Sequence, residues 1–128
     1  MKKLVVVEDE DSLRDDLVDV LTEAGYAVRA AANGQEGLAL ILSEPPDLVI
    51  CDRLMPVMSG YDLLDALRRD RPDLNDLSFI FLTALTDTRD RQAVADLNPT
   101  LYLGKPIDHR DLLRVVADLL EMPHRAPG

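Results

Sequence analysis

Residues 4–11 read Leu-Val-Val-Val-Glu-Asp-Glu-Asp, four apolar residues followed at once by four acids. A continuous apolar run that is rich in β-branched valine is typical of a strand covered on both faces of a parallel sheet. Acids directly after such a strand lie at its carboxyl end, which is where open α/β sheets bind their ligands. This stretch therefore predicts a buried first strand with a functional site at its end.

Four more short apolar runs follow along the chain, at residues 28–31, 48–51, 79–82 and 101–103. The segments between and after them have apolar residues at helical spacing, with the weakest pattern at about 87–97. Strands that alternate regularly with helices predict an α/β fold, with a parallel sheet, helices on both faces and right-handed crossovers.

The predicted helix starts share a second pattern, a short polar residue followed three positions later by an acid. The first residue can accept a hydrogen bond from a free backbone N–H, and the acid favours the positive end of the helix dipole. The five pairs are Ser12/Asp15, Asn33/Glu36, Ser59/Asp62, Asp87/Asp90 and Asp108/Asp111. Because the pattern recurs at every expected start, it supports five helices independently of the apolar spacing.

The 128 residues suit one domain at 1–121, followed by a tail or the start of a linker at 122–128. The formal net charge is −10, and no cluster of Lys and Arg is present, so direct nucleic-acid binding by this domain is not expected. No apolar run is long enough for a membrane span or a signal peptide. The single cysteine, Cys51, cannot form an internal disulfide, which agrees with a cytoplasmic location.

Chemically active side chains follow four of the five predicted strands. Glu8 and Asp9 follow the first, Asp52 the third, Thr83 the fourth and Lys105 the fifth. Since parallel strands end at the same edge of a sheet, these groups are expected to meet there. Clustered carboxylates bind a hard divalent cation such as Mg²⁺, and an aspartate can act as a nucleophile toward phosphorus. The cation, the ammonium and the hydroxyl would stabilise the charge of a transferring phosphoryl group. The alternative is that these are solvated loop residues, and for Glu10 a solvated position and a place at the rim of the site are both open.

The chain resembles the receiver domain of two-component response regulators (CheY-like domains) over residues 3–121. Four stretches carry the resemblance, in order and at proper intervals: Leu-Val-Val-Val-Glu-Asp-Glu-Asp (4–11), Asp-Arg-Leu-Met-Pro-Val-Met-Ser-Gly (52–60), Phe-Leu-Thr-Ala (81–84) and Tyr-Leu-Gly-Lys-Pro (102–106). The resemblance implies a flavodoxin-like (βα)5 doubly wound parallel sheet of strand order 2-1-3-4-5, the order that chemotaxis receivers also have.

The resemblance also implies a role for each acid. Asp52 would accept a phosphoryl group from a sensor histidine kinase or a histidine phosphotransfer protein, in a Mg²⁺-dependent reaction. Asp9, Asp52 and the backbone carbonyl of Leu54 would be metal ligands, with Glu8 acting partly through water. The chain would then be a phosphoacceptor signalling domain and not an enzyme acting on an external substrate.

Three further residues receive roles from the same resemblance. Thr83 would be the hydroxyl that turns toward the phosphoryl oxygens, and Tyr102 the aromatic switch residue that moves with it. Lys105 would pair with the phosphate, and its bond to Pro106 is expected to be cis, an arrangement that proline makes accessible. Phosphorylation would bias an output face made of the predicted fourth helix, fifth strand and fifth helix, which is also an expected surface for a homodimer.

Three other functions compete with phosphate acceptance. A haloacid-dehalogenase-type phosphohydrolase needs a second acid two residues after the nucleophile, where this chain has Leu54. A dinucleotide-binding domain needs a Gly-rich turn after the first strand, where acids would repel a pyrophosphate. A phosphorylation-independent interaction module with the same fold is the remaining alternative. In the family that the chain resembles, side chains two residues beyond the acceptor and the threonine influence how water reaches the phosphoaspartate. Here these residues are Leu54 and Leu85, which offer no polar group to orient water, so slow autodephosphorylation is expected.

Overall fold

The computed structural model describes residues 1–52, 57–74, 76–83 and 101–121. The strands are β1 (Lys3–Val7), β2 (Ala27–Ala31), β3 (Leu48–Asp52), β4 (Ser78–Thr83) and β5 (Leu101–Gly104). The helices are α1 (Asp11–Glu23), α2 (Gly34–Ser43), α3 (Gly60–Asp70) and α5 (His109–Glu121), with a short 3₁₀ turn at Pro72–Leu74. All five predicted strands are confirmed, each within one residue of its expected ends.

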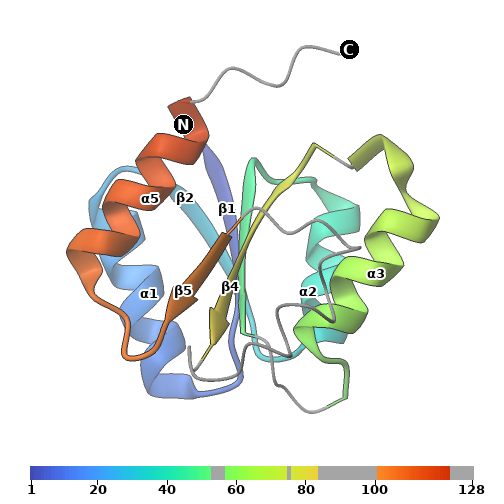
Figure 1. Cartoon of the computed structure of the whole chain (residues 1–128), viewed down its shortest axis with the longest axis horizontal. Coiled ribbons are helices and arrows are strands. Elements are labelled where there is room, and N and C mark those ends of the chain that lie inside the picture. The colour runs from blue at the N-terminus through green and yellow to red at the C-terminus, as the bar shows by residue number, and fades with distance from the viewer. Residues whose placement is uncertain (53–56, 75, 84–100, 122–128) are drawn as a thin grey trace.

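The five strands form one parallel sheet of order β2-β1-β3-β4-β5, which confirms the predicted doubly wound topology. Helices α1 and α5 cover one face of the sheet, and α2 and α3 cover the other (Figure 1). The three central strands are β1, β3 and β4, and their residues are almost all buried, as their continuous apolar sequences predict.

Alternate residues of the central strands point to opposite faces, so the sheet separates two apolar clusters. Val5, Val49 and Phe79 pack toward α2 and α3, against Leu63, Leu64 and Leu67 among others. Leu4, Ile50 and Ile80 pack toward α1 and α5, against Leu17, Leu21, Leu112 and Val116. At roughly 1.5–3 kcal/mol for each fully buried aliphatic or aromatic side chain, these two layers hold the strand ends in a fixed register.

The helix caps agree with the sequence at three starts. Asn33 accepts from Glu36 N at 2.9 Å, and Ser59 accepts from Asp62 N at 3.1 Å. Asp108 accepts from Arg110 N at 2.8 Å and from Asp111 N at 3.1 Å. The pair Asp87/Asp90 and the predicted fourth helix lie outside the described residues.

The predicted cap at Ser12 is wrong, because α1 already begins at Asp11 and Ser12 lies inside it. Glu10 occupies the cap position, and its side chain makes no capping hydrogen bond. The physical reason is that the Glu8 carboxylate accepts from Glu10 N at 3.0 Å. That bond closes the turn before the helix. The first helical hydrogen bond therefore runs from Arg14 N to Glu10 O at 2.9 Å, and the helix begins closer to β1 than predicted.

Within the described ranges, no helix has both the length and the apolar character needed to cross a bilayer. Cys51 is buried among apolar side chains, and burial raises the pKa of its thiol, so it is a small core residue as its strand position suggests.

Candidate functional site

Strand register brings the chemically active residues to one edge of the sheet. Asp52 is the last residue of β3 and Thr83 is the last residue of β4. Val7, the last residue of β1, is paired with Cys51, so the acids after β1 start beside Asp52. Thr83 is paired with Gly104, which places Lys105 just beyond the same edge.

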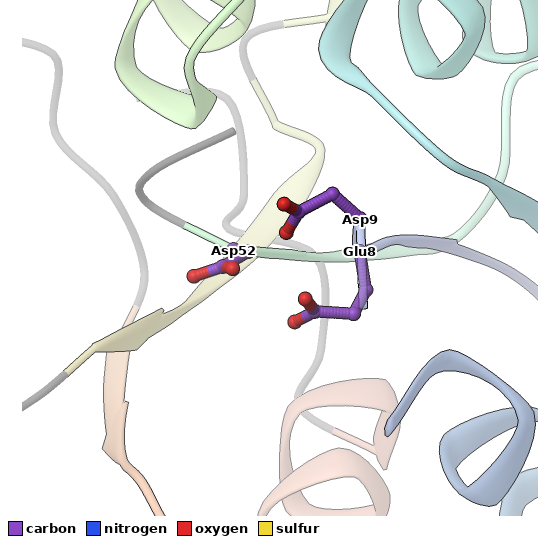
Figure 2. Close-up of side chains that lie close together, drawn as sticks. All are labelled: Glu8, Asp9 and Asp52. Atoms are coloured by element: carbon purple, nitrogen blue, oxygen red, sulfur yellow. The ribbon is translucent and has the colours of Figure 1, made fainter. Parts of the chain in front are cut away.

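Three carboxylates meet at this edge. Glu8, Asp9 and Asp52 each offer an oxygen, and these oxygens lie within 4.8 Å of one another. Figure 2 shows the three side chains close together and pointing to the same side, with Glu8 and Asp9 adjacent along the chain and Asp52 on β3. Glu8 is fully buried and Asp52 is 6 % exposed, whereas Asp9 is exposed to solvent. Among these three residues, solvent therefore reaches the cluster mainly at Asp9.

Lys105 brings a positive charge to the site. Its Nζ lies 3.1 Å from Asp52 Oδ2 and 3.6 Å from Glu8 Oε1. Its backbone N–H donates to the Thr83 carbonyl at 2.8 Å, which fixes the chain after β5 against the end of β4. The peptide bond between Lys105 and Pro106 is cis, as the resemblance implied.

The electrostatics of the site follow from burial and charge. Burial raises the pKa of the Glu8 carboxyl to about 7, and the negative charge of Asp52 adds to the rise, while the Glu10 N–H and Lys105 oppose it. Burial alone would lower the pKa of Lys105, but its hydrogen bond to Asp52 and the charges of Asp52 and Glu8 raise it above its ordinary value. The lysine therefore stays charged and neutralises only part of the acidic cluster.

The donor set fits a divalent cation. Glu8 Oε1 is buried, and among the described residues no donor forms a hydrogen bond with it. A buried carboxylate oxygen without a donor is costly, and a metal ion or its bound water would satisfy it. Oxygen ligands from two or three carboxylates, with solvent access at Asp9, suit Mg²⁺. The residues that could hold such an ion are Glu8, Asp9 and Asp52.

The remaining predicted site residues occupy different positions. Thr83 is almost fully buried at the end of β4, on the edge of the sheet that carries Asp52. Tyr102 is half-buried in β5, and its ring lies 6.0 Å from that of Phe81, in contact with the core on the α3 side. Glu10 is exposed and lines a groove beside Lys105. Leu54, whose carbonyl was predicted as a metal ligand, lies outside the described residues, as does Leu85.

Two residues near the site were not assigned from the sequence. Gly60, the first residue of α3, packs so closely on the end of β3 that a Cβ there would collide with the Asp52 carbonyl oxygen and press on Phe81. Arg14, in α1, donates to the Glu8 carbonyl. Gly60 is the last residue of the stretch 52–60, and its fixed spacing from Asp52 could have indicated that it lies near the site. The bond of Arg14 depends on side-chain geometry that no sequence pattern reveals.

Comparison with known proteins identifies the family. The model of the response regulator receiver domain matches residues 4–117. The chain is 38 % identical over 119 residues to a probable transcriptional regulator, ycf27, of Cyanophora paradoxa, covering 93 % of this chain and 48 % of that protein. The chain thus spans about half the length of the curated relatives it matches.

Solved structures agree in fold. The Vibrio cholerae chemotaxis protein CheY4 superposes with a TM-score of 0.86 at 31 % identity, covering 93 % of this chain and 98 % of that one. The signal receiver domain of a signal transduction histidine kinase from Syntrophus aciditrophicus gives a TM-score of 0.88 at 32 % identity, covering 100 % and 96 %. This chain belongs to the response regulator receiver domain family and is a signalling domain of two-component systems.

Proposed function

We propose that Asp52 accepts a phosphoryl group from a phosphohistidine of a sensor histidine kinase or a histidine phosphotransfer protein. The observation that carries the proposal is the placement of the Asp52 carboxylate 3.1 Å from the Lys105 ammonium and within 4.8 Å of the Glu8 and Asp9 carboxylate oxygens. A nearly buried carboxylate between a fixed cation and a candidate metal site is arranged for reaction with a phosphoryl group.

The chemistry is a direct displacement at phosphorus. An Asp52 oxygen forms the new P–O bond as the P–N bond to the donor imidazole breaks, and the imidazole leaves with its electron pair and takes up a proton. Lys105 pairs with one developing phosphoryl oxygen, and the Thr83 hydroxyl turns to donate to another. Asp9, Asp52, the carbonyl of Leu54 and, in part through water, Glu8 would hold Mg²⁺, which would supply further positive charge for the phosphoryl oxygens.

The phosphoryl group then biases an output surface. Thr83 and Tyr102 lie on neighbouring strands, β4 and β5, and Phe81 of β4 packs on the Tyr102 ring. A hydroxyl drawn toward the phosphoryl oxygens would leave space that Tyr102 can enter. This would shift the population of the proposed output face, which comprises β5, α5 and the helix predicted from the sequence between β4 and β5. That face is the proposed surface for a target or a second copy of the chain.

The wider setting is proposed from charge, cysteine content and length. With a net charge of −10, this domain is proposed to bind no nucleic acid directly. A cytoplasmic location is proposed because the single cysteine, Cys51, cannot form an internal disulfide. The relative from Cyanophora paradoxa is described as a transcriptional regulator and is about twice as long, so a DNA-binding output would belong to a separate part of a full-length protein.

Intact-mass measurement after incubation with acetyl phosphate and MgCl₂ tests this function. The expected result is a gain of one phosphoryl group, lost when EDTA replaces MgCl₂ and lost in Asp52→Asn. No gain by the wild-type chain would favour the alternative, a phosphorylation-independent interaction module with the same fold.

A further inference from the structure

Arg14 reaches back from α1 to the acid-bearing turn that follows β1. Its Nη1 donates to the Glu8 carbonyl oxygen at 2.9 Å, and its Nη2 lies 2.6 Å from Asp11 Oδ1. The arginine side chain is only 19 % exposed, although Asp11 is 84 % exposed. Because this largely buried guanidinium donates to a main-chain carbonyl, it holds the backbone after β1 in addition to forming an ion pair with Asp11.

The bond completes a set of tethers around Glu8. The Glu8 N–H donates to the Ala31 carbonyl of β2 at 3.0 Å, and the Glu8 side chain accepts from Glu10 N at 3.0 Å. Arg14 supplies the third tether, on the Glu8 carbonyl. Together they fix both peptide groups of Glu8 and the direction of its side chain.

This fixation opposes an electrostatic cost. Glu8 is fully buried, and its carboxylate lies among those of Asp9 and Asp52. Without a cation, repulsion and desolvation would favour a turn in which Glu8 moves out toward water. A turn held by Arg14 would keep the three oxygens together before the ion arrives, so less ordering would be needed on binding.

We propose that Arg14 is a positioning residue for the metal-binding acids and raises Mg²⁺ affinity by holding the Glu8 backbone. The proposal rests on the proposed Mg²⁺ site and goes beyond it by assigning a residue that is not a ligand. The sign of the effect on Mg²⁺ affinity separates positioning from charge. A positive charge near a cation site weakens cation binding by simple repulsion, so an arginine acting through charge alone would strengthen binding when removed.

The chain contains a matched control. Arg114 and Asp111 form the same i, i+3 pair on α5, with Nη2 at 3.2 Å from Asp111 Oδ1. Arg114→Gln therefore removes the same charge and the same type of helix pair without touching the turn after β1. Asp11→Asn is the complementary variant, because it weakens the helix pair and leaves the bond from Arg14 to the Glu8 carbonyl in place.

The test is a Mg²⁺ titration of the metal-free wild-type chain and the three variants, followed by ¹H–¹⁵N NMR at constant ionic strength. Arg14→Gln is expected to bind Mg²⁺ roughly tenfold more weakly, as is usual when a residue that orients a metal ligand is removed. Arg114→Gln and Asp11→Asn are expected to stay within about twofold of the wild type, well short of that loss.

Equal or tighter binding by Arg14→Gln overturns the proposal while leaving the proposed function intact. Absence of Mg²⁺ binding by the folded wild-type chain overturns both. Should Arg14→Gln fail to fold, Arg14→Met decides in its place, because it keeps an unbranched apolar side chain but has no donor for the Glu8 carbonyl. Weaker binding by Arg14→Met supports the proposal, and unchanged or tighter binding overturns it.

Discussion

The Lys105 ammonium lies 3.1 Å from the Asp52 carboxylate, although the two residues are 53 positions apart in the chain. They come together because β3 pairs with β4 and β4 with β5, and the Lys105 N–H is bound to the Thr83 carbonyl. The ion pair is half enclosed, with the lysine side chain 31 % exposed and the Asp52 side chain 9 % exposed. In the proposed function, an oxygen of the phosphoryl group on Asp52 would replace the Asp52 carboxylate as the ion-pair partner of Lys105.

Replacing Lys105 by Met should slow phosphorylation of Asp52 by acetyl phosphate on the order of 100-fold, because one fixed cation is lost from the developing charge. The measurement is the initial rate of phosphoryl gain by intact mass at saturating Mg²⁺. Lys2→Met is the control, since Lys2 is exposed at the opposite end of β1. An unchanged rate in Lys105→Met would contradict the role given to the lysine.

Glu8 should make metal-free stability depend on pH. Its pKa is about 7 in the folded chain and close to 4.5 when unfolded, so folding favours its protonated form. Its contribution is therefore complete below about pH 4.5 and is lost as the pH rises toward 7. We expect the Tm of the wild type in EDTA to fall by several degrees relative to Glu8→Gln between pH 5 and pH 8.

Groups that titrate in both proteins cancel when wild type and Glu8→Gln are compared. Adding Mg²⁺ at pH 8 should raise the Tm of the wild type more than the Tm of Glu8→Gln, because Glu8 helps to bind the ion. A Tm difference between wild type and Glu8→Gln that stays constant with pH would contradict the burial of an ionisable Glu8.

Gly60 should be needed for the geometry of Asp52. The Cβ of Gly60→Ala would collide with the Asp52 carbonyl oxygen, so α3 or the end of β3 must move, at a cost of about 1–3 kcal/mol. Because the displaced group is the acceptor's own main chain, phosphorylation should slow even at temperatures where the variant is fully folded.

Gly25→Ala provides the comparison for Gly60→Ala. Gly25 has φ of +101° and open space around it, so alanine there costs about 1–2 kcal/mol through backbone strain alone. Denaturant unfolding should show a loss of stability in both variants, and intact mass should show slow phosphorylation only in Gly60→Ala. Equal phosphorylation rates in the two variants would show that the contact of Gly60 with the Asp52 main chain is not needed for phosphorylation.

The phosphorylated chain should lose its phosphate slowly. The residues two beyond Asp52 and two beyond Thr83 are Leu54 and Leu85, and neither offers a polar group to orient an attacking water. The measurement is the decay of the phosphorylated mass after acetyl phosphate is removed by desalting. Leu54→Asn should shorten the lifetime, and a wild-type lifetime of only seconds would contradict this expectation.

The sequence predicts the fold well because a strand that is buried on both faces of the sheet has a continuously apolar sequence. The runs ending at Val7, Cys51 and Leu82 are continuously apolar, and this is characteristic of central strands in a parallel sheet. The acids and Lys105 were predictable as a group, since residues that follow parallel strands share one edge. The cap at Ser12 was wrongly predicted because a side chain from the preceding loop, that of Glu8, closes the turn.

Other features depend on contacts that no local pattern contains. The bond from Arg14 to the Glu8 carbonyl spans six residues across a turn, and the direction of the guanidinium follows from packing. The contact of Gly60 with the Asp52 carbonyl depends on how closely α3 approaches β3. The fully buried state of Glu8, which sets its pKa, likewise follows from the neighbours that the fold supplies.

Reductive trapping tests phosphate acceptance by Asp52 most directly. Borohydride converts an aspartyl phosphate into homoserine, so treatment of the acetyl-phosphate-reacted chain followed by peptide mapping reports the modified residue. We predict homoserine at position 52, dependent on Mg²⁺, and none elsewhere among the acids of the cluster. Modification at Glu8 or Asp9 in place of Asp52, or no modification of the folded chain, would contradict the proposed function.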